Sequence, residues 1–381
     1  MTLVTAVILT LNRPDVLRRQ LLYYANKPVH LIFADGSDVD WGGGDSGSSG
    51  EMTWEYFRVE GYHSFSERLS ESCLRVKTDF IFFLDDEEPI LWTGIEKAIE
   101  FLEQNSDYSC AGGRVDHMRQ YSGYLGIMSY RHWGEKFEIS GESPLERLKV
   151  LMFSGRNLNL VWQVMRTNEV KRFVRMSQTE FFFKPGRYIG LYELGLSGFL
   201  VITGKWKMGD YPYWIRYGGS QKSQERNKYF DIEDAKILAE LFETALIGFE
   251  VPNPLNQGKT AQAIIDSGTF STFFVEGAEA KVRHNLRKVE ARTSKLDAAV
   301  LKLKKLPKSL LVKFLFLIWR VAPSLYRVLR PNGVRRLKTH AKIYGHGDKK
   351  IIEDLSLVEK IWGQFPNGLS QSQYQQELAR V

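Results

Sequence analysis

Three short apolar runs near the start of the chain constrain its fold most strongly. Residues 3–9, 29–34 and 79–84 are dominated by aliphatic and aromatic side chains, a pattern typical of strands buried on both faces of a sheet. Segments with helical spacing, 16–25 and 66–77, stand between them. This alternation predicts an α/β fold in which the loops after the strands share one edge of the sheet, where open α/β sheets bind their ligands.

Strands and helices continue to alternate through the first part of the chain. Further helices are predicted at 92–104, 143–153, 167–175 and 189–203, and further strands at 108–115, 125–131, 159–166 and 205–216. The Gly- and Ser-rich stretch 41–53 is predicted to be a mobile loop. Beyond residue 230 the spacing is helical, so we expect a domain over 1–225 and a basic, mainly helical region over 226–381.

Four consecutive acids, Asp85 to Glu88, follow the third apolar run directly. Their mutual repulsion is relieved by a hard divalent cation, and Mg²⁺ or Mn²⁺ is usually held by one or two carboxylates together with the phosphates of a substrate. Alternatively, Glu87 and Glu88 interact favourably with the N-terminus of the helix that begins near Trp92. The metal interpretation favours Asp85 and Asp86 over the two glutamates.

The segments AVILTLNRP, LIFADGS and FIFFLDDEE, in this order, resemble the inverting glycosyltransferases of family 2. The resemblance implies a GT-A fold, which is Rossmann-like with a mixed central sheet and flanking helices. It also implies a nucleotide-sugar donor. The residues it assigns to the donor are Thr10, Asn12 and Arg13 in the first loop, Asp35 against the base, Arg68 on the helix before the acids, and Asp85, with Asp86 and Glu87 at the metal.

A second stretch, YELGLSGFLVITGKWKMGDYPYWIR, extends the resemblance to residue 216. The family places its general base where Glu193 stands, then a Gly-Lys pair matched by Lys205, and then a basic residue matched by Arg216. Such a base removes the proton of the acceptor hydroxyl, while the two cations stand beside the diphosphate. Leu194 replaces a common second acid, and the acids 85–88 replace an Asp-x-Asp motif. These departures resemble a divergent bacterial branch that acts in surface-polysaccharide synthesis.

Each of these residues also has a structural interpretation. Asp35, within Asp-Gly-Ser, fits an Asx turn after a strand. Glu193 fits the start of a helix or an ion pair, and Arg216 fits an exposed surface position. We expect the functional interpretation for Asp35 and Glu193, whereas for Arg216 both interpretations stay open.

The basic charge is concentrated near the C-terminus. Residues 281–350 contain 20 Lys and Arg against three acids, a net charge of +17, which leaves −10 for the rest of the chain. Within 307–330, a strongly apolar segment carries Lys313, Arg320 and Arg327 at seven-residue intervals, on one helical face. This pattern predicts docking on an anionic membrane surface rather than on nucleic acid. A solvated face, or a helix packed on the first domain, would produce the same pattern.

The start of the chain resembles no secretory signal, and the two cysteines suit a reducing compartment, so we expect a cytoplasmic protein peripheral to the inner face of the cell membrane. The expected acceptor is then a glycan or a lipid-linked glycan. A sugar nucleotidyltransferase is a rival interpretation, but LTLNRPD lacks the glycine-rich loop that such an enzyme needs after its first strand. The sequence also leaves open a non-enzymatic membrane- or nucleic-acid-binding protein and an inactive GT-A scaffold.

Overall fold

The computed structural model describes most of the first 217 residues and parts of the C-terminal region. The described residues are 3–59, 65–121, 124–129, 137–153, 160–177, 189–217, 335–336, 348–364 and 370–378, with 238, 241, 242, 244 and 245. The predicted basic helix at 307–330 and the predicted helix at 277–305 lie outside these residues. Residue 225, the predicted domain boundary, lies outside them too.

The fold opens with a β-α-β unit, as the sequence predicts. Strand β1 (Val4–Thr10) is followed by helix α1 (Pro14–Tyr24) and strand β2 (Val29–Asp35), which pairs with β1 in parallel from Val4 opposite Val29 to Thr10 opposite Asp35. Strand β5 (Phe80–Asp85) lies parallel to β1 on its other side, with Leu9 opposite Asp85. Three strand ends therefore meet at one edge of the sheet.

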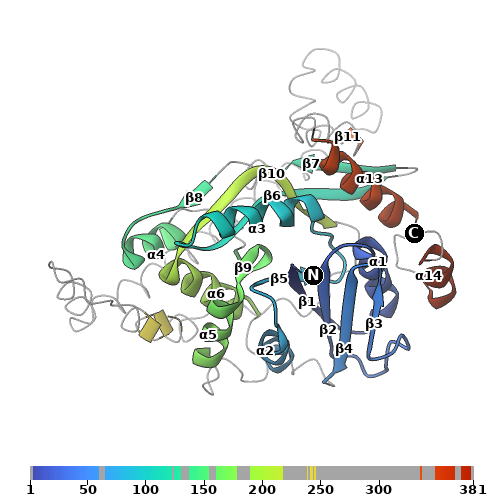
Figure 1. The fold of residues 1–381 in the computed structure, drawn as a ribbon, viewed down its shortest axis with the longest axis horizontal. Coiled ribbons are helices and arrows are strands. Elements are labelled where there is room, and N and C mark those ends of the chain that lie inside the picture. Colours follow the sequence, from blue (N-terminus) through green and yellow to red (C-terminus); the bar gives the residue numbers. More distant parts are fainter. Residues whose placement is uncertain are drawn as a thin grey trace, which may run out of the picture.

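The described strands form one mixed sheet with the order β11-β7-β6-β9-β5-β1-β2-β4-β3, to which β10 adds beside β6 and β8 beside β10 (Figure 1). The other strands are β3 (Ser46–Ser49), β4 (Met52–Arg58), β6 (Tyr108–Tyr121), β7 (Tyr124–Ser129), β8 (Phe137–Ile139), β9 (Val164–Arg166), β10 (Lys205–Tyr217) and β11 (Arg335–Arg336). Strand β9 runs antiparallel between β5 and β6, whereas β10 is parallel to β6. The protein therefore has a mixed α/β architecture.

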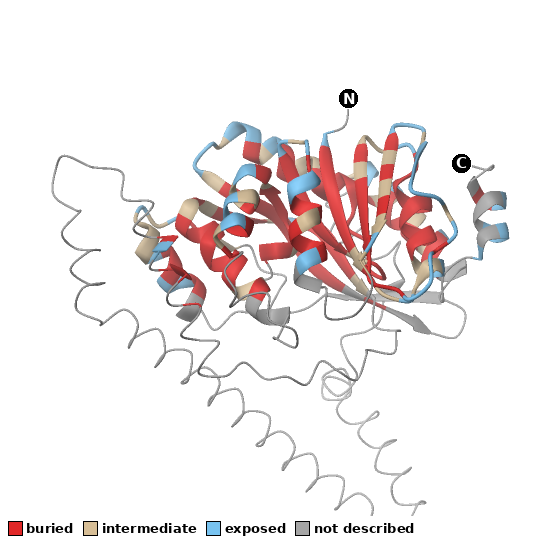
Figure 2. Ribbon diagram, turned by 90° about the horizontal axis from the view of Figure 1, so that it is seen from below, coloured by how far each residue is buried: buried red, intermediate tan, exposed pale blue. Residues whose placement is uncertain are grey.

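Helices cover both faces of this sheet, and each face has its own hydrophobic core. Alternate residues of β1 separate the two, since Ala6 and Ile8 join one cluster and Val7 joins the other. The first cluster involves α1 and α3 (Trp92–Gln104). The second cluster involves α2 (Phe65–Arg75), α4 (Pro144–Phe153), the 3-10 helix η2 (Leu160–Trp162), α5 (Thr167–Ser177) and α6 (Ile189–Thr203). Burial runs along the central strands and alternates around the helices (Figure 2).

Two C-terminal helices pack on the first core. Helix α13 (Lys349–Gln364) contacts α1 and α3, and α14 (Gln371–Leu378) contacts α1 (Figure 1). The buried residues of α13 recur at helical spacing and belong to the same cluster as β1 and α3: Ile351, Leu355, Val358, Ile361 and Trp362. The described part of the C-terminal region thus shares a hydrophobic core with residues of the N-terminal part.

The prediction of a mobile loop over 41–53 is wrong for Ser46–Ser49 and for Met52 and Thr53, which begin β4. Ser46–Ser49 form β3, which pairs antiparallel with β4, with Gly50 at the turn in a left-handed conformation (φ 59°). Small polar residues serve here because β3 is an edge strand whose backbone alone pairs with β4. Trp41 is buried and stacks on Tyr56, with 5.2 to 5.5 Å between its ring and those of Trp54 and Tyr56.

Among the described residues, no helix combines the length and the apolar character needed to cross a bilayer.

Of the helix predicted beyond residue 230, five residues are described. Leu238, Leu241, Phe242 and Ala245 are buried in the second cluster, and the Phe242 ring lies against Gly198 of α6.

Candidate functional site

Hydrogen bonds connect the loop after β1 to the turn after β2. The Asn12 N–H donates to the Ser37 hydroxyl at 2.5 Å, and the Gly36 N–H donates to the Thr10 carbonyl at 3.0 Å. Asn12 adopts a left-handed conformation (φ 56°), which asparagine tolerates better than most residues. The two predicted donor-binding loops therefore form one continuous edge beside β1 and β2.

Asp35 is buried and holds the turn that it begins. Its Oδ1 accepts hydrogen bonds from the Ser37 N–H (2.9 Å) and hydroxyl, and its Oδ2 accepts one from the Tyr56 hydroxyl at 2.8 Å. Burial, together with the Asp35 carboxylate, raises the pKa of Tyr56. The structure thus contains the Asx turn that the Asp-Gly-Ser sequence allows. Contact between Asp35 and a nucleotide base stays a prediction.

Arg68 lies on α2, the helix before Asp85–Glu88, and packs against this turn. Its guanidinium fills the space that a side chain at Gly36 would need, and its Nη1 donates to the Val59 carbonyl at 3.4 Å. Burial lowers the pKa of Arg68, while the charge of Asp35 opposes that effect. Strand β2 and helix α2 therefore bring a buried cation and a buried carboxylate together.

The acidic segment, defined as Asp85–Glu88, is tied to the loop after β1 by side chains. The Thr10 hydroxyl donates to Asp86 Oδ2 at 2.9 Å. Arg13 Nη1 lies 3.2 Å from Asp86 Oδ1 and also forms an ion pair with Glu87. The structure thus brings together four residues that the sequence assigned to the donor site and the metal.

Burial makes this segment electrostatically unfavourable on its own. Burial raises the pKa of Asp86 well above its usual range, the neighbouring Asp85 raises it further, and Arg13 opposes the shift. Burial likewise raises the pKa of Glu88 to about 8, with Asp85 adding to the effect and Arg216 opposing it. An additional cation at the site would lower these pKa values and stabilise the ionised carboxylates.

The backbone of the acidic segment is held from two sides. The Gln20 side-chain nitrogen of α1 lies 3.1 to 3.2 Å from the carbonyl oxygens of Asp85, Asp86 and Glu88, which share its two N–H groups. From the other end of the chain, the Trp362 indole N–H donates to the Glu87 carbonyl at 2.8 Å. Sequence reasoning missed both residues. A polar residue on the apolar face of its helix was a signal for Gln20, whereas the local sequence around Trp362 gives none.

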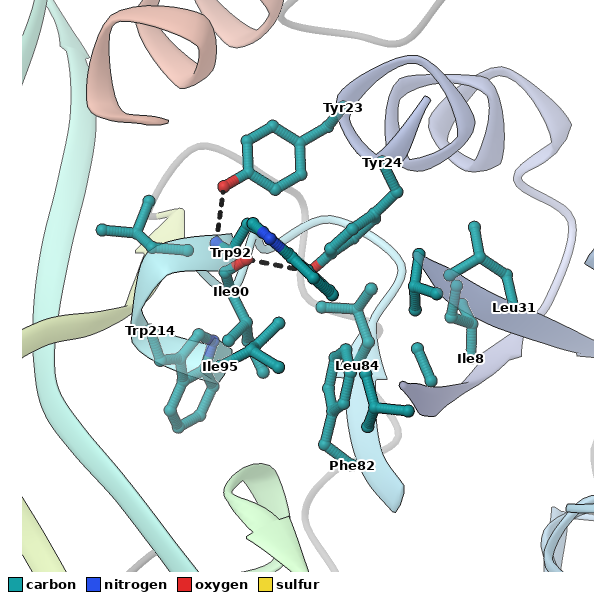
Figure 3. Packing of buried hydrophobic residues seen from close by; sticks show 14 of the residues in the cluster. Ile8, Tyr23, Tyr24, Leu31, Phe82, Leu84, Ile90, Trp92, Ile95 and Trp214 are labelled. Carbon is teal, nitrogen blue, oxygen red and sulfur yellow. Dashed lines mark hydrogen bonds between the residues drawn. The ribbon is translucent and has the colours of Figure 1, made fainter. Parts of the chain in front are cut away.

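The chain leaving the acidic segment is also anchored. The Ile215 N–H donates to the Pro89 carbonyl at 3.0 Å, and the Leu91 N–H donates to the Tyr213 carbonyl at 2.7 Å, so β10 fixes this stretch. Two hydroxyls of α1 add hydrogen bonds here (Figure 3): Tyr24 donates to the Ile90 carbonyl at 2.9 Å, and Tyr23 accepts from the Trp92 N–H at 3.1 Å. The segment therefore has little freedom to change its path.

The two basic residues predicted on β10 lie at opposite ends of that strand. Arg216 Nε is 3.5 Å from Glu88 Oε1, and its guanidinium lies 5.0 Å from the Trp214 ring centroid. Lys205 pairs with Asp107 at 3.0 Å and with Glu142 at 2.9 Å. Lys205 lies opposite Tyr108 of β6 and Arg216 lies opposite His117, so the two residues are roughly 30 Å apart along the sheet. The structure brings Arg216 to the acidic segment and leaves Lys205 away from it.

Glu193, the predicted general base, lies near the start of α6 and is half-buried. Its neighbour Tyr192 is buried against Phe173 of α5, with 5.0 Å between the ring centroids. Helix α6 packs on α4, α5, β6 and β10. The catalytic role of Glu193 stays a prediction that this packing does not test.

Among the described residues, no group of three or more His, Cys, Asp and Glu side chains is arranged as a complete metal site. Asp85 directly precedes Asp86, and the charge of Asp85 raises the pKa of the Asp86 carboxyl group further. Two adjacent carboxylates fit the kind of Mg²⁺ or Mn²⁺ site in which water and substrate phosphates supply the other ligands. Asp85 and Asp86 fit such a cation, and its binding stays a prediction.

No protein-family model matches the sequence, and neither does any curated protein. Solved structures of S. aureus TarS show a weak likeness. TarS 1–349 is 10% identical, with a TM-score of 0.44 over 77% of this chain and 91% of that one. Its complex with UDP-GlcNAc is 11% identical, with a TM-score of 0.44 over 77% of this chain and 92% of that one. Its complex with UDP is 10% identical, with a TM-score of 0.43 over 95% of this chain and 91% of that one. Similarity at this level assigns the chain to no family.

Proposed function

We propose that this chain is a glycosyltransferase that uses a nucleotide-diphosphate sugar and binds the donor at the strand ends of β1, β2 and β5. One observation carries the proposal: Asp86 at the end of β5 is joined by Thr10 and Arg13 to the loop after β1. Three segments that resemble family 2 glycosyltransferases, far apart in sequence, thus meet at one edge. Such an edge is where open α/β sheets bind their ligands.

The charges around the acidic segment suit a departing nucleoside diphosphate. Asp85 and Asp86, with Glu87 beside them, are the residues that would hold Mg²⁺ or Mn²⁺, which supplies positive charge to the leaving phosphates. Arg13 and Arg216 flank the same segment and offer guanidinium N–H groups that pair well with phosphate oxygens. In this proposal Asp35 and Arg68 shape the turn that receives the nucleoside.

The proposed transfer is a single displacement with inversion. Glu193 takes the proton of the acceptor hydroxyl as the hydroxyl oxygen bonds to the anomeric carbon, and the bond from that carbon to the diphosphate breaks on the opposite face. The proposed acceptor is a glycan or lipid-linked glycan of a surface polysaccharide. Residues 307–330 would hold the protein at the anionic inner face of the membrane, where such an acceptor is reached.

The proposal is tested by measuring nucleotide-sugar hydrolysis and transfer with Mg²⁺ or Mn²⁺ across a set of donors. Asp86→Ala is expected to lower turnover about 10²–10³-fold and to abolish metal-dependent nucleotide binding. Glu193→Gln is expected to bind nucleotide normally and to lose transfer by about 10²–10⁴-fold. Glu142→Gln, an exposed acid at the far end of β10, is the matched control and should behave as wild type.

Two results would contradict parts of this proposal separately. Full transfer by Glu193→Gln would remove that residue as the base and leave the donor site standing. A wild-type protein that binds no nucleoside diphosphate with either cation would refute the glycosyltransferase function itself.

A further inference from the structure

Helix α13 reaches the acidic segment through Trp362. This side chain is fully buried, and its indole N–H donates to the Glu87 carbonyl at 2.8 Å across 275 residues of sequence. Its ring packs edge-on to Tyr23, with 5.9 Å between centroids, and the Arg19 guanidinium lies 5.2 Å from the indole. The orientation of the indole is thus set by α1, the helix that also carries Gln20.

A second contact joins α13 to the helix that follows the acids. Asp354, two turns before Trp362, accepts hydrogen bonds from the Thr93 N–H and the Thr93 hydroxyl, both at 2.6 Å. Lys27 lies 3.6 Å from its other oxygen. Because Thr93 is in the first turn of α3, this contact satisfies a backbone donor that helix geometry leaves free. Helix α13 therefore fixes the peptide on both sides of Pro89.

Each of the four acidic residues has its carbonyl oxygen held by a side chain. Gln20 holds those of Asp85, Asp86 and Glu88, and Trp362 holds that of Glu87. A carbonyl fixed in direction fixes its peptide plane, because the peptide group is planar. The planes on both sides of the Glu87 and Glu88 Cα atoms are held in this way, and together they determine where the Cα–Cβ bonds of both residues point.

We propose that Trp362 is a positioning residue for the donor site: its hydrogen bond to the Glu87 carbonyl aims the carboxylates of the acidic segment at the cation and diphosphate. This inference rests on the proposed function, and it assigns part of the donor site to the C-terminal region. The indole N–H binds the backbone carbonyl of Glu87, and in this proposal it acts on the carboxylates through that peptide group.

The test compares Trp362→Phe with Trp206→Phe in the full chain. Both changes remove a buried indole N–H and keep an aromatic ring, but Trp206 donates to Gln163 at 2.5 Å, beside β8 and away from the acids. Amide hydrogen exchange is measured on peptides covering 80–92, together with KM for the donor and its dependence on Mg²⁺ concentration. Thermal unfolding of both variants serves as the measure of general destabilisation.

We expect the Tm of both variants to fall by similar amounts. In Trp362→Phe alone, exchange over 85–91 should rise, and the donor KM should increase about five- to tenfold, the cost of one buried hydrogen bond. Saturating Mg²⁺ should restore most of the donor affinity, because the cation reorders the carboxylates. Equal exchange and equal KM in the two variants would overturn the positioning role. If wild-type protein binds no nucleoside diphosphate, the proposed function fails, while the exchange data still decide whether Trp362 orders the segment.

Discussion

The two ends of β10 carry the same kind of charge pair in different surroundings. At one end Lys205 pairs with Glu142 and Asp107, whose side chains are 89% and 56% exposed. At the other end Arg216 pairs with Glu88, whose side chain is 8% exposed. Water screens the first pair, so its contribution to stability is small. The second pair has lost much of that water, and its carboxylate is therefore sensitive to every neighbouring charge.

This difference shows that burial at the sheet edge changes the pKa of an acidic residue. Asp85 and Glu87 both raise the pKa of Glu88, and Arg216 lowers it, after burial has already shifted it upward. The presence of Lys or Arg near Asp or Glu in the sequence does not reveal how far burial and neighbouring charges shift the pKa of the acid. The position of a basic residue along β10 decides whether its acidic partner is solvated or lies buried among other charges.

The largest expected effect concerns the pH dependence of stability. The pKa of Glu88 is about 8 in the folded chain and 4.5 in the unfolded one, so the folded chain binds more protons between these values. The free energy of unfolding should therefore fall as pH rises from 4.5 to 8, by up to about 4 kcal/mol from this group. Glu88→Gln should remove that slope and be more stable than wild type at pH 8. The measurement is chemical denaturation at pH 5, 6.5 and 8 in EDTA.

The control for this pH series is Glu142→Gln, at the solvated end of β10. Its slope should match that of wild type, because water screens its charge. A Glu88→Gln variant with an unchanged slope would show that the two ends of the strand do not differ in the way described.

An intermediate effect is expected when the buried pair loses its cation. Arg216→Met keeps an aliphatic side chain over Trp214 and removes the charge beside Glu88. Near pH 9, where Glu88 is ionised, we expect a loss of about 2 kcal/mol of stability, below the usual cost of breaking a fully buried pair because Arg216 is partly exposed. At pH 6 Glu88 is protonated, so the loss should shrink. Denaturation of the single variants and of Arg216→Met with Glu88→Gln gives the coupling directly, and additive effects would argue against the pair.

The smallest effect is expected at the solvated end. Lys205→Met removes the cation shared by Asp107 and Glu142, and we expect no measurable change in Tm or in nucleotide binding. Calorimetry and a nucleotide titration on the same preparation check both expectations. A clear loss of nucleotide binding would return Lys205 to the donor site that the resemblance assigned to it.

Local patterns in the sequence predicted the helices and strands whose limits depend on their own residues. The helices at 92–104 and 189–203 have the predicted limits, and the strand ends at Thr10, Asp35 and Asp85 lie together as the β-α-β pattern implies. A run of apolar residues bounded by polar ones carries that information by itself.

Features that depend on distant partners could not be predicted in this way. Strand β3 has the composition of a loop and forms because β4 offers it backbone partners. Lys205 follows Gly204 as the family pattern requires, but the length of β10 carries it away from the acids. No periodicity around Trp362 indicates that its indole meets a residue 275 positions earlier.

The hydrogen bond between Trp362 and Glu87 also has a consequence for biosynthesis. A ribosome adds about 5–20 residues per second, so the indole is made roughly 14 to 55 seconds after the carbonyl that it serves, 275 residues later. During that interval the nascent first half can form β1, β2 and β5 from its own residues, yet one peptide of the acidic segment lacks its partner. This peptide of the acidic segment is therefore held in place only after residue 362 has been made and α13 has folded back onto α1.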